Sequence, residues 1–170
     1  KPTLTIGDAQ AIARDCPAVL RVSHATIQPE QIVAGKKNWG ARVYGTTDTY
    51  AAVRDWPLSS GEFLNEQQLR SAANVVVLGS AVHENLFEPG EEVVGQTIRI
   101  KNARFRIVGV LQPKGRTPSG QDQDDAVFIP HTTMERKIAG QRLPGLVHFI
   151  LVSAQTGELV AQAKREAEEL

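Results

Sequence analysis

The stretch from residue 74 to residue 113 constrains the possible folds more than any other part of the chain. It opens with an apolar run, Val75–Leu78, that stops at Gly79, as a buried strand does where the chain must turn. Ser80 stands where a helix N-cap is wanted, and apolar residues at helical spacing follow it as far as Pro89. The pattern predicts a buried strand followed directly by a short helix.

The second part of this stretch is typical of a β-hairpin. Apolar and polar residues alternate over 97–101 and again over 104–107, with a short turn between them. Such alternation buries one face of each strand and leaves the other face exposed. Together with the preceding strand and helix, it predicts an α+β fold.

Composition limits the class of protein. With 41% hydrophobic residues among 170, the chain is long enough to bury a core, and its 19 basic residues balance its 19 acidic residues. A neutral chain gives no reason to expect nucleic acid as a partner. The single cysteine, Cys16, cannot form an internal disulfide, and no window approaches the about 20 apolar residues that a membrane-spanning helix needs.

The rest of the chain is expected to alternate between helices and strands. Thr5 and Asp8 have the spacing of a capping box, with a helix after them that Pro17 ends. Clustered Pro, Ser and Gly over 57–61 are interpreted as a lobe boundary. The other expected elements are strands over 18–27, 31–34, 39–45, 126–129 and 146–152, and helices that begin at Thr46 or Thr47, at Thr132 or Thr133, and at Thr156.

Two residues resemble parts of catalytic motifs, and both lack the rest of the motif. His83 would need a second histidine four residues later to hold zinc, and Phe87 stands there. Ser80 follows a strand as a hydrolase nucleophile does, but the G-x-S-x-G pattern is absent. We therefore interpret His83 as a helix-surface residue, Ser80 as an N-cap, and the tryptophans Trp39 and Trp56 as core residues.

Asp122, Asp124 and Asp125 form an acidic cluster in a loop. Ca²⁺ prefers several such oxygens, but Ala126 begins a strand where an EF-hand would continue to its last ligand. His131 lies beyond that strand, with no second group placed by spacing to orient it as a base. A metal-dependent hydrolase built from these residues stays open as an alternative, whereas no catalytic residue, cofactor or metal is predicted.

Several short segments share their order and spacing with one known family. They are the residues at 43–47 and 61–63, the Leu-Gly before the predicted helix and the Leu-Phe at its end, and the residues at 95–100, 105–111 and 124–133. From these segments, and as far as about residue 152, the chain resembles the MacB-type periplasmic core domain. That domain is the large external domain of certain ABC transporter permeases, and it is related to the FtsX superfamily.

The resemblance implies a two-lobed α+β fold. A porter-like mixed α/β lobe over about 1–60 and 126–170 would be interrupted by a smaller inserted α/β lobe over about 61–125. The resemblance also implies that the chain is an excised piece of an inner-membrane protein, with one membrane helix before it and another after it. The domain would then lie in the periplasm.

The function that the resemblance implies is transmission of movement and not catalysis. The domain would pass an ATP-driven conformational change to a periplasmic adaptor or to a macrolide, peptide or lipoprotein cargo. Its implied partners are a cytoplasmic ATP-binding subunit or domain, an adaptor protein, and a second permease chain in a homodimer or heterodimer. The alternative is a free-standing secreted module that binds a peptide or a lipid.

The segment 114–125 is the candidate contact site for such a partner. It carries no apolar residue, so it cannot supply core and is expected to be an exposed, mobile loop. Its charges have both signs, which suits a protein contact. The candidate contact residues are Lys114, Arg116, Asp122, Asp124 and Asp125.

Overall fold

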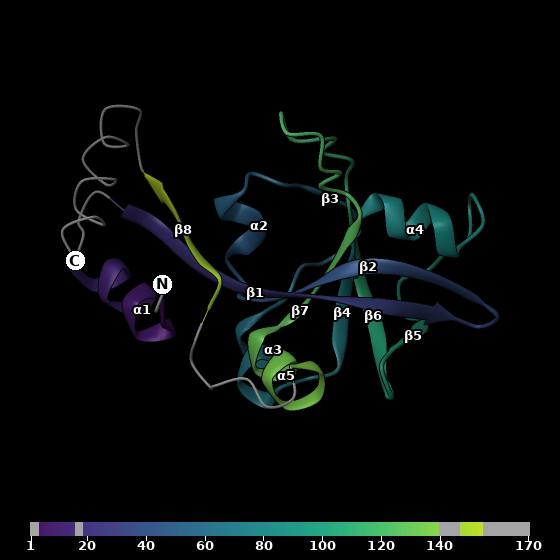
Figure 1. Ribbon diagram of the computed structural model, residues 1–170, viewed down its shortest axis with the longest axis horizontal. Helices are drawn as coiled ribbons and strands as arrows, with labels where there is room; N and C mark the ends of the chain where they lie inside the picture. Colours follow the sequence, from purple (N-terminus) through teal and green to yellow (C-terminus); the bar gives the residue numbers. More distant parts are fainter. Residues whose placement is uncertain (1–3, 16–18, 140–146, 155–170) are drawn as a thin grey trace.

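The computed structural model describes residues 4–15, 19–139 and 147–154. These residues form a mixed fold of helices around one sheet (Figure 1), which confirms the α+β prediction. The helices are α1 (Ile6–Asp15), α2 (Tyr50–Val53), α3 (Glu66–Ser71), α4 (Ser80–Leu86), α5 (His131–Thr133) and the π-helical turn η1 (Met134–Ile138). The strands are β1 (Val19–Ala34), β2 (Lys37–Thr46), β3 (Leu58–Gly61), β4 (Val75–Leu78), β5 (Thr97–Ile100), β6 (Ala103–Leu111), β7 (Ala126–Pro130) and β8 (Phe149–Ala154).

The sheet closes on itself. Its strand order is β2-β7-β4-β6-β5-β1-β8, and β1 pairs with β2 as well. The strands β1, β2, β7, β4, β6 and β5 therefore form a ring, in which β8 is attached outside on β1 and β3 outside on β6. Ring closure leaves few free strand edges within the described residues, and a free edge is where strands of different molecules tend to pair.

Alternate residues of the ring strands pack into two hydrophobic clusters, as the side-chain period of two in a strand requires. Every strand of the ring contributes to the first cluster, which therefore lies inside the ring, and α4 and η1 complete it. The second cluster lies on the other face of β4, β6 and β7 and contains Tyr44, Tyr50, Trp56 and Phe128. The burial of Trp56 agrees with the core position expected for it.

The longest element is the ribbon of β1 and β2. The two strands pair antiparallel from Ala25↔Thr46 to Ala34↔Lys37, and Gly35 turns between them with φ +60°. Pro29 lies inside β1, although a break was expected there. The backbone amide of Ile27 points away from β2 and donates to His148. The backbone nitrogen of Pro29, two residues further along the strand, points to the same side. Its missing N–H therefore removes no hydrogen bond between β1 and β2.

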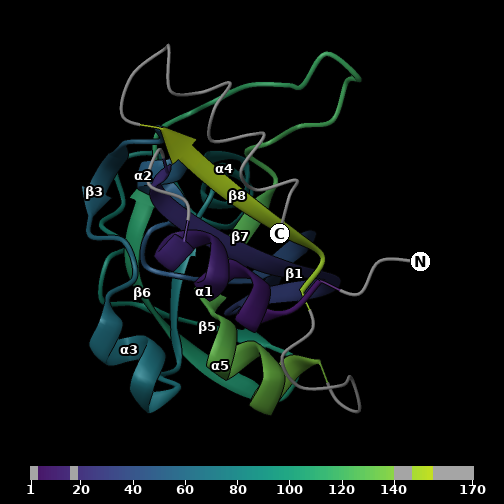
Figure 2. The same ribbon diagram turned by 90° about the vertical axis from the view of Figure 1, so that its left-hand side faces the viewer.

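Local predictions hold in the best-patterned parts of the chain. The Thr5 amide donates to the Asp8 carboxylate at 3.0 Å, and the Asp8 amide donates to the Thr5 hydroxyl at 3.1 Å, as a capping box requires. The strand β4 and the hairpin of β5 and β6 lie where they were expected. Figure 2 shows α1 and β8 beside β1, and β8 begins three residues later than predicted. Cys16 and the expected helix from Thr156 lie outside the described residues.

One strand was missed, and one local prediction was wrong. Residues 58–61 form β3, an edge strand paired with β6, and they were missed because polar and small residues gave no apolar alternation. The N-cap of α4 is Gly79 and not Ser80, which is the first helical residue and is buried. The helix start needs no capping side chain, because the amide of Ala81 donates to the Asp124 carbonyl at 3.1 Å.

The division into two lobes stays a prediction. Strands from the expected inserted segment are hydrogen-bonded to strands from outside it: β4 lies between β6 and β7, and β5 pairs with β1. One sheet therefore joins the two segments in the described part of the chain.

Candidate interaction surface around the segment 114–125

The segment 114–125 leaves the end of β6 and returns to the start of β7. It folds back on itself, with a bridge between Arg116 and Asp122 and a bond from the Gln123 amide to the Gly115 carbonyl at 3.0 Å. The tip turns at Gly120, where φ is +93°. A mobile loop was expected from the absence of apolar residues. Hydrogen bonds shape the segment, most of which is exposed as expected, and they leave no apolar signal in the sequence; its mobility stays a prediction.

Asp124 is built into the interior. It is 7% exposed, and its two carboxylate oxygens accept the amides of Lys114 at 2.7 Å and Gly115 at 3.0 Å. Its own amide donates to the carboxylate of Asp122 at 3.0 Å. Asp124 therefore closes the base of the segment, and the prediction that it contacts a partner does not fit its burial.

Two more of the predicted residues bind β2. The carboxylate of Asp125 accepts the indole N–H of Trp39 at 2.7 Å, and the Asp122 carbonyl accepts a bond from Arg42 at 2.7 Å. Both aspartates are half-buried. These bonds position the segment over the ribbon of β1 and β2.

The basic residues of the segment have different surroundings. The Lys114 ammonium is half-buried and donates to the Arg54 carbonyl at 2.9 Å. Arg116 is exposed and donates to the Gly120 carbonyl at the tip, at 2.8 Å. Of the five predicted contact residues, Arg116 is the one that the structure places fully at the surface.

Beneath the segment lies a cluster of aromatic and basic side chains that sequence reasoning missed. The Arg42 guanidinium lies 5.5 Å from the Tyr44 ring, and the Arg54 guanidinium lies 5.8 Å from Tyr50 and 5.6 Å from Trp56. At these distances each cation interacts with the negative face of a ring. The i, i+4 spacing of Tyr50 and Arg54 in a predicted helix was a signal that could have indicated part of this cluster.

The Tyr50 phenol lies in the buried part of this cluster. Burial raises the pKa of Tyr50 to about 12, although the nearby Arg54 acts to lower it. The Tyr50 hydroxyl accepts a bond from Arg54 at 2.9 Å. The cluster is therefore a low-dielectric environment in which charge interactions are stronger than at an open surface.

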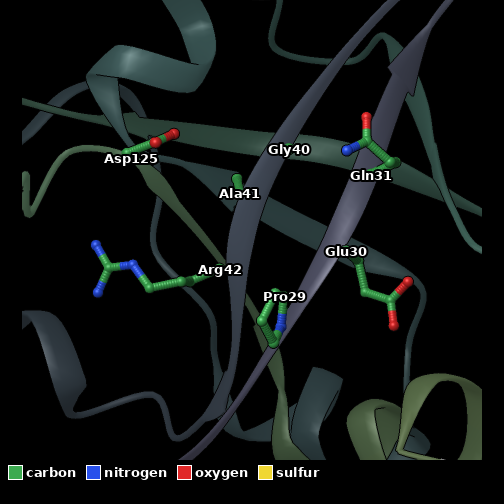
Figure 3. Close-up of a pocket in the computed structure, with 7 residues that line it drawn as sticks. All are labelled: Pro29, Glu30, Gln31, Gly40, Ala41, Arg42 and Asp125. Carbon is green, nitrogen blue, oxygen red and sulfur yellow. The ribbon is translucent and has the colours of Figure 1, made fainter.

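Two hollows flank Arg42. The first, which we call the loop pocket, has a volume of about 70 Å³ and is lined by Arg42, Tyr44, Tyr50, Arg54, Trp56, Thr117, Gln121, Gln123 and Phe128. The second, which we call the ribbon groove, has a volume of about 490 Å³ and is lined by Pro29, Glu30, Gln31, Gly40, Ala41, Arg42 and Asp125. Figure 3 shows Arg42 and Asp125 on one side of the ribbon groove and Glu30 and Gln31 on the other.

The residues of the hydrolase alternative do not come together. Asp125 precedes β7 and His131 follows it, so a strand spanning roughly 17–20 Å separates them. The His131 ring packs edge-on against His24, with ring centroids 4.8 Å apart. Within the described ranges, no three metal-ligating side chains are grouped to hold an ion.

His24 and His131 form a buried pair with unusual electrostatics. Burial, and to a smaller extent the neighbouring His131, lower the pKa of His24 to about 4. Burial also lowers the pKa of His131, while the charges of Glu135 and Asp48 act to raise it. Each Nδ1 atom is buried without a hydrogen-bond partner among the described residues. Both rings are therefore neutral at pH 7.

Among the helices that the structure describes, none is both long and apolar enough to cross a membrane. His83 was expected on the surface of a helix; it lies on α4 but is half-buried, with its ring 6.2 Å from that of Phe87. Trp39 is half-buried beside the segment, and Trp56 is buried and donates to the Gln112 carbonyl at 2.8 Å.

Comparison with known proteins gives consistent relatives. The chain is 41% identical over 142 residues to the macrolide export ATP-binding/permease protein MacB of Syntrophobacter fumaroxidans, covering 83% of the chain and 20% of that protein. It is 28% identical over 167 residues to the pyoverdine export ATP-binding/permease protein PvdT of Pseudomonas fluorescens, covering 98% of the chain and 25% of that protein. The chain thus spans about a fifth to a quarter of the length of these relatives.

Solved structures give the same result. The periplasmic region of MacB from Actinobacillus actinomycetemcomitans matches with a TM-score of 0.79 and 25% identity, over 99% of this chain and 73% of that one. The extracellular domain of the noncanonic ABC-type transporter YknZ from Gram-positive bacteria shares the fold, with a TM-score of 0.78 at 12% identity, over 98% of this chain and 81% of that one. A family described as the MacB-like periplasmic core domain matches residues 1–170. The resemblance inferred from short segments is therefore confirmed, and the chain belongs to the family of MacB-like periplasmic core domains.

Proposed function

We propose that this chain is the periplasmic domain of an ABC-type export permease in an inner membrane. The observation that carries the proposal is the family match over all 170 residues, together with the fold shared with the periplasmic region of a MacB protein. The matching relatives are export proteins whose names include both an ATP-binding part and a permease part. In this proposal, ATP is hydrolysed in another part of the protein or in a separate chain.

The domain itself works by transmitting movement and catalyses nothing. The closed ring of strands supports this role, because displacement of one strand in a hydrogen-bonded ring is passed to the strands that pair with it. The aspartates first considered as metal ligands, Asp122, Asp124 and Asp125, hold the segment 114–125 in place. The cargo is a small molecule, a peptide or a lipoprotein, and the working unit contains two permease chains.

The exposed tip of the segment 114–125 is the proposed contact with a periplasmic adaptor. The burial of Asp124 and the internal bonds of Lys114 narrow the candidates to Arg116 and the tip residues that follow it. The substitution Arg116→Glu is expected to weaken adaptor binding about tenfold in a surface-binding assay. Arg104→Glu is the matched control, because Arg104 is exposed at the opposite end of β6. If Arg116→Glu and Arg104→Glu bind the adaptor with equal affinity, the tip is not part of the adaptor interface.

The flanks of the parent gene test the proposed location. About 20 apolar residues shortly before codon 1 and again shortly after codon 170 are expected for a domain held between two membrane helices. Hydrophilic flanks with a cleavable signal would contradict the proposal and favour the secreted binding module.

A further inference from the structure

Three cationic side chains converge on the rings of Tyr44, Tyr50 and Trp56. Besides Arg42 and Arg54, the Lys114 ammonium lies 5.4 Å from the Trp56 ring. The cations come from three separate parts of the chain: β2, the end of α2 and the segment 114–125. The tertiary fold therefore concentrates positive charge at one place in a chain whose net charge is zero.

None of these three cations is ion-paired with a carboxylate in the described part of the chain. The Arg42 guanidinium donates to the Tyr44 hydroxyl at 2.6 Å and to a carbonyl. Arg54 donates to the Tyr50 hydroxyl and to the amide oxygen of Gln123, and Lys114 donates to a carbonyl. All of these acceptors are neutral, so within the described residues the three half-buried cations are hydrogen-bonded but not directly paired with a carboxylate.

The aspartates of the segment 114–125 form no ion pair with these cations within the described residues, and their carboxylate oxygens accept other groups. Both oxygens of Asp124 accept backbone amides, and one oxygen each of Asp122 and Asp125 accepts an N–H group. Among the described residues, no acidic side chain lines the loop pocket, and Thr117, Gln121 and Gln123 supply uncharged polar groups to it. Two guanidinium groups are thus the charged groups of the described lining, and they can donate charge-assisted hydrogen bonds to an anion.

The size of the loop pocket limits what can enter. Its volume of about 70 Å³ exceeds that of two water molecules, at about 30 Å³ each, and is far below the about 300 Å³ at which drug-sized sites begin. A single carboxylate group fits, and a macrolide-sized cargo does not. The ribbon groove, which shares Arg42, is larger and suits an extended chain.

We propose that the loop pocket receives the carboxylate of an aspartate or glutamate side chain from a polypeptide partner lying along the ribbon groove. Glu30 and Asp125 line that groove and repel acidic groups. Arg42 lines both the groove and the pocket, and it attracts the carboxylate toward the pocket. The choice of a polypeptide partner rests on the proposed function, whereas the affinity of the pocket for a carboxylate does not.

The test is an NMR titration of the 170-residue chain that follows the indole N–H resonance of Trp56, assigned with the variant Trp39→Phe. The probes are the peptide acetyl-Gly-Ser-Glu-Ser-Gly-amide, the same peptide with Gln for Glu, and sodium propionate. The Glu peptide is expected to shift the resonance saturably, and the Gln peptide to bind at least about tenfold more weakly. Propionate is expected to bind more weakly than the Glu peptide.

Two variants and one control locate the effect. Arg54→Gln and Lys114→Gln are each expected to weaken binding of the Glu peptide about tenfold, and Arg116→Gln by less than about twofold. Lys114→Gln keeps the test valid if Arg54→Gln disturbs packing, since the Lys114 ammonium donates to a backbone carbonyl and the backbone bond of Lys114 to Asp124 is kept in the variant. No saturable shift, or equal loss in Arg116→Gln, would overturn the inference and leave the transporter proposal untouched. Propionate binding as tightly as the peptide would overturn the choice of a polypeptide.

Discussion

A Cβ atom on Gly79 would overlap the carbonyl oxygen of Asp124, and it would lie 2.7 Å from the carbonyl oxygen of Ala126. The close approach lets the Gly79 amide donate to the Ala126 carbonyl at 2.8 Å. It also lets the Ala81 amide, in the first turn of α4, donate to the Asp124 carbonyl. The start of α4 is thus held by the same backbone that closes the segment 114–125. Gly79 is therefore both the N-cap of α4 and the position where the helix start packs directly against the backbone of residues 124 and 126.

The substitution Gly79→Ala should destabilise the domain by about 3 kcal/mol, because the added methyl group meets backbone atoms that cannot rotate away. Gly40→Ala is the matched control. There the added atom would lie 2.9 Å from the amide nitrogen at the end of the exposed Gln31 side chain, which can move. Urea unfolding of both variants measures the difference, and a similar midpoint for both would contradict this reason for the glycine.

Asp124→Ala should cost about 2 to 4 kcal/mol of unfolding free energy. The change leaves the amides of Lys114 and Gly115 without their carboxylate acceptor at a buried position. Gln121→Ala, at an exposed position in the same segment, is expected to change the free energy by less than about 0.5 kcal/mol. Guanidinium unfolding followed by tryptophan fluorescence checks both values. Equal stability of the two variants would show that the carboxylate is dispensable.

Acid should destabilise the domain through His24. Its pKa in the folded state is lowered from 6.5 to about 4, so the unfolded chain binds more protons between these values. Stability is therefore expected to be fully present above pH 6.5 and to fall as pH drops toward 4, by about 2 to 3 kcal/mol from this group. The lowered pKa of His131 adds to the loss in the same direction.

The variant His24→Phe should flatten this pH dependence, since a ring remains to pack against His131 while one titrating group is removed. His83→Gln serves as the control, because its ring contacts Phe87 of its own helix and not the histidine pair. Thermal unfolding between pH 4 and pH 7.5 gives the two curves. A slope in His24→Phe as steep as that of the unchanged chain would assign the acid sensitivity to other groups.

A second capping box should stabilise α3. The Asn65 side chain accepts the amide of Gln68 at 2.9 Å, and the Gln68 side chain accepts the amide of Asn65 at 3.0 Å. Asn65→Ala is expected to cost about 1 kcal/mol, whereas Gln67→Ala on the same helix should cost nothing measurable. Hydrogen exchange of the α3 amides distinguishes the two variants. Faster exchange in Gln67→Ala than in Asn65→Ala would contradict the capping role.

The sequence alone determined the elements whose signal is local. The apolar run of β4, the alternation in β5 and β6, and the capping box of Thr5 and Asp8 each depend on neighbouring residues, and each was located correctly. Family membership followed as well, because structural glycines and core residues keep their order and spacing along the chain. The second capping box was equally readable from sequence but was missed.

The tertiary structure alone decided the ring of strands and the surface around the segment 114–125. Ring closure depends on pairings between strands far apart in sequence, such as β2 with β7, that no local pattern specifies. The same holds for Arg42, Arg54 and Lys114, which meet at one aromatic cluster only when three distant elements come together. Asp124 had the local pattern of a solvated loop residue, and its burial followed from long-range hydrogen bonds that hydrophobic patterning does not encode.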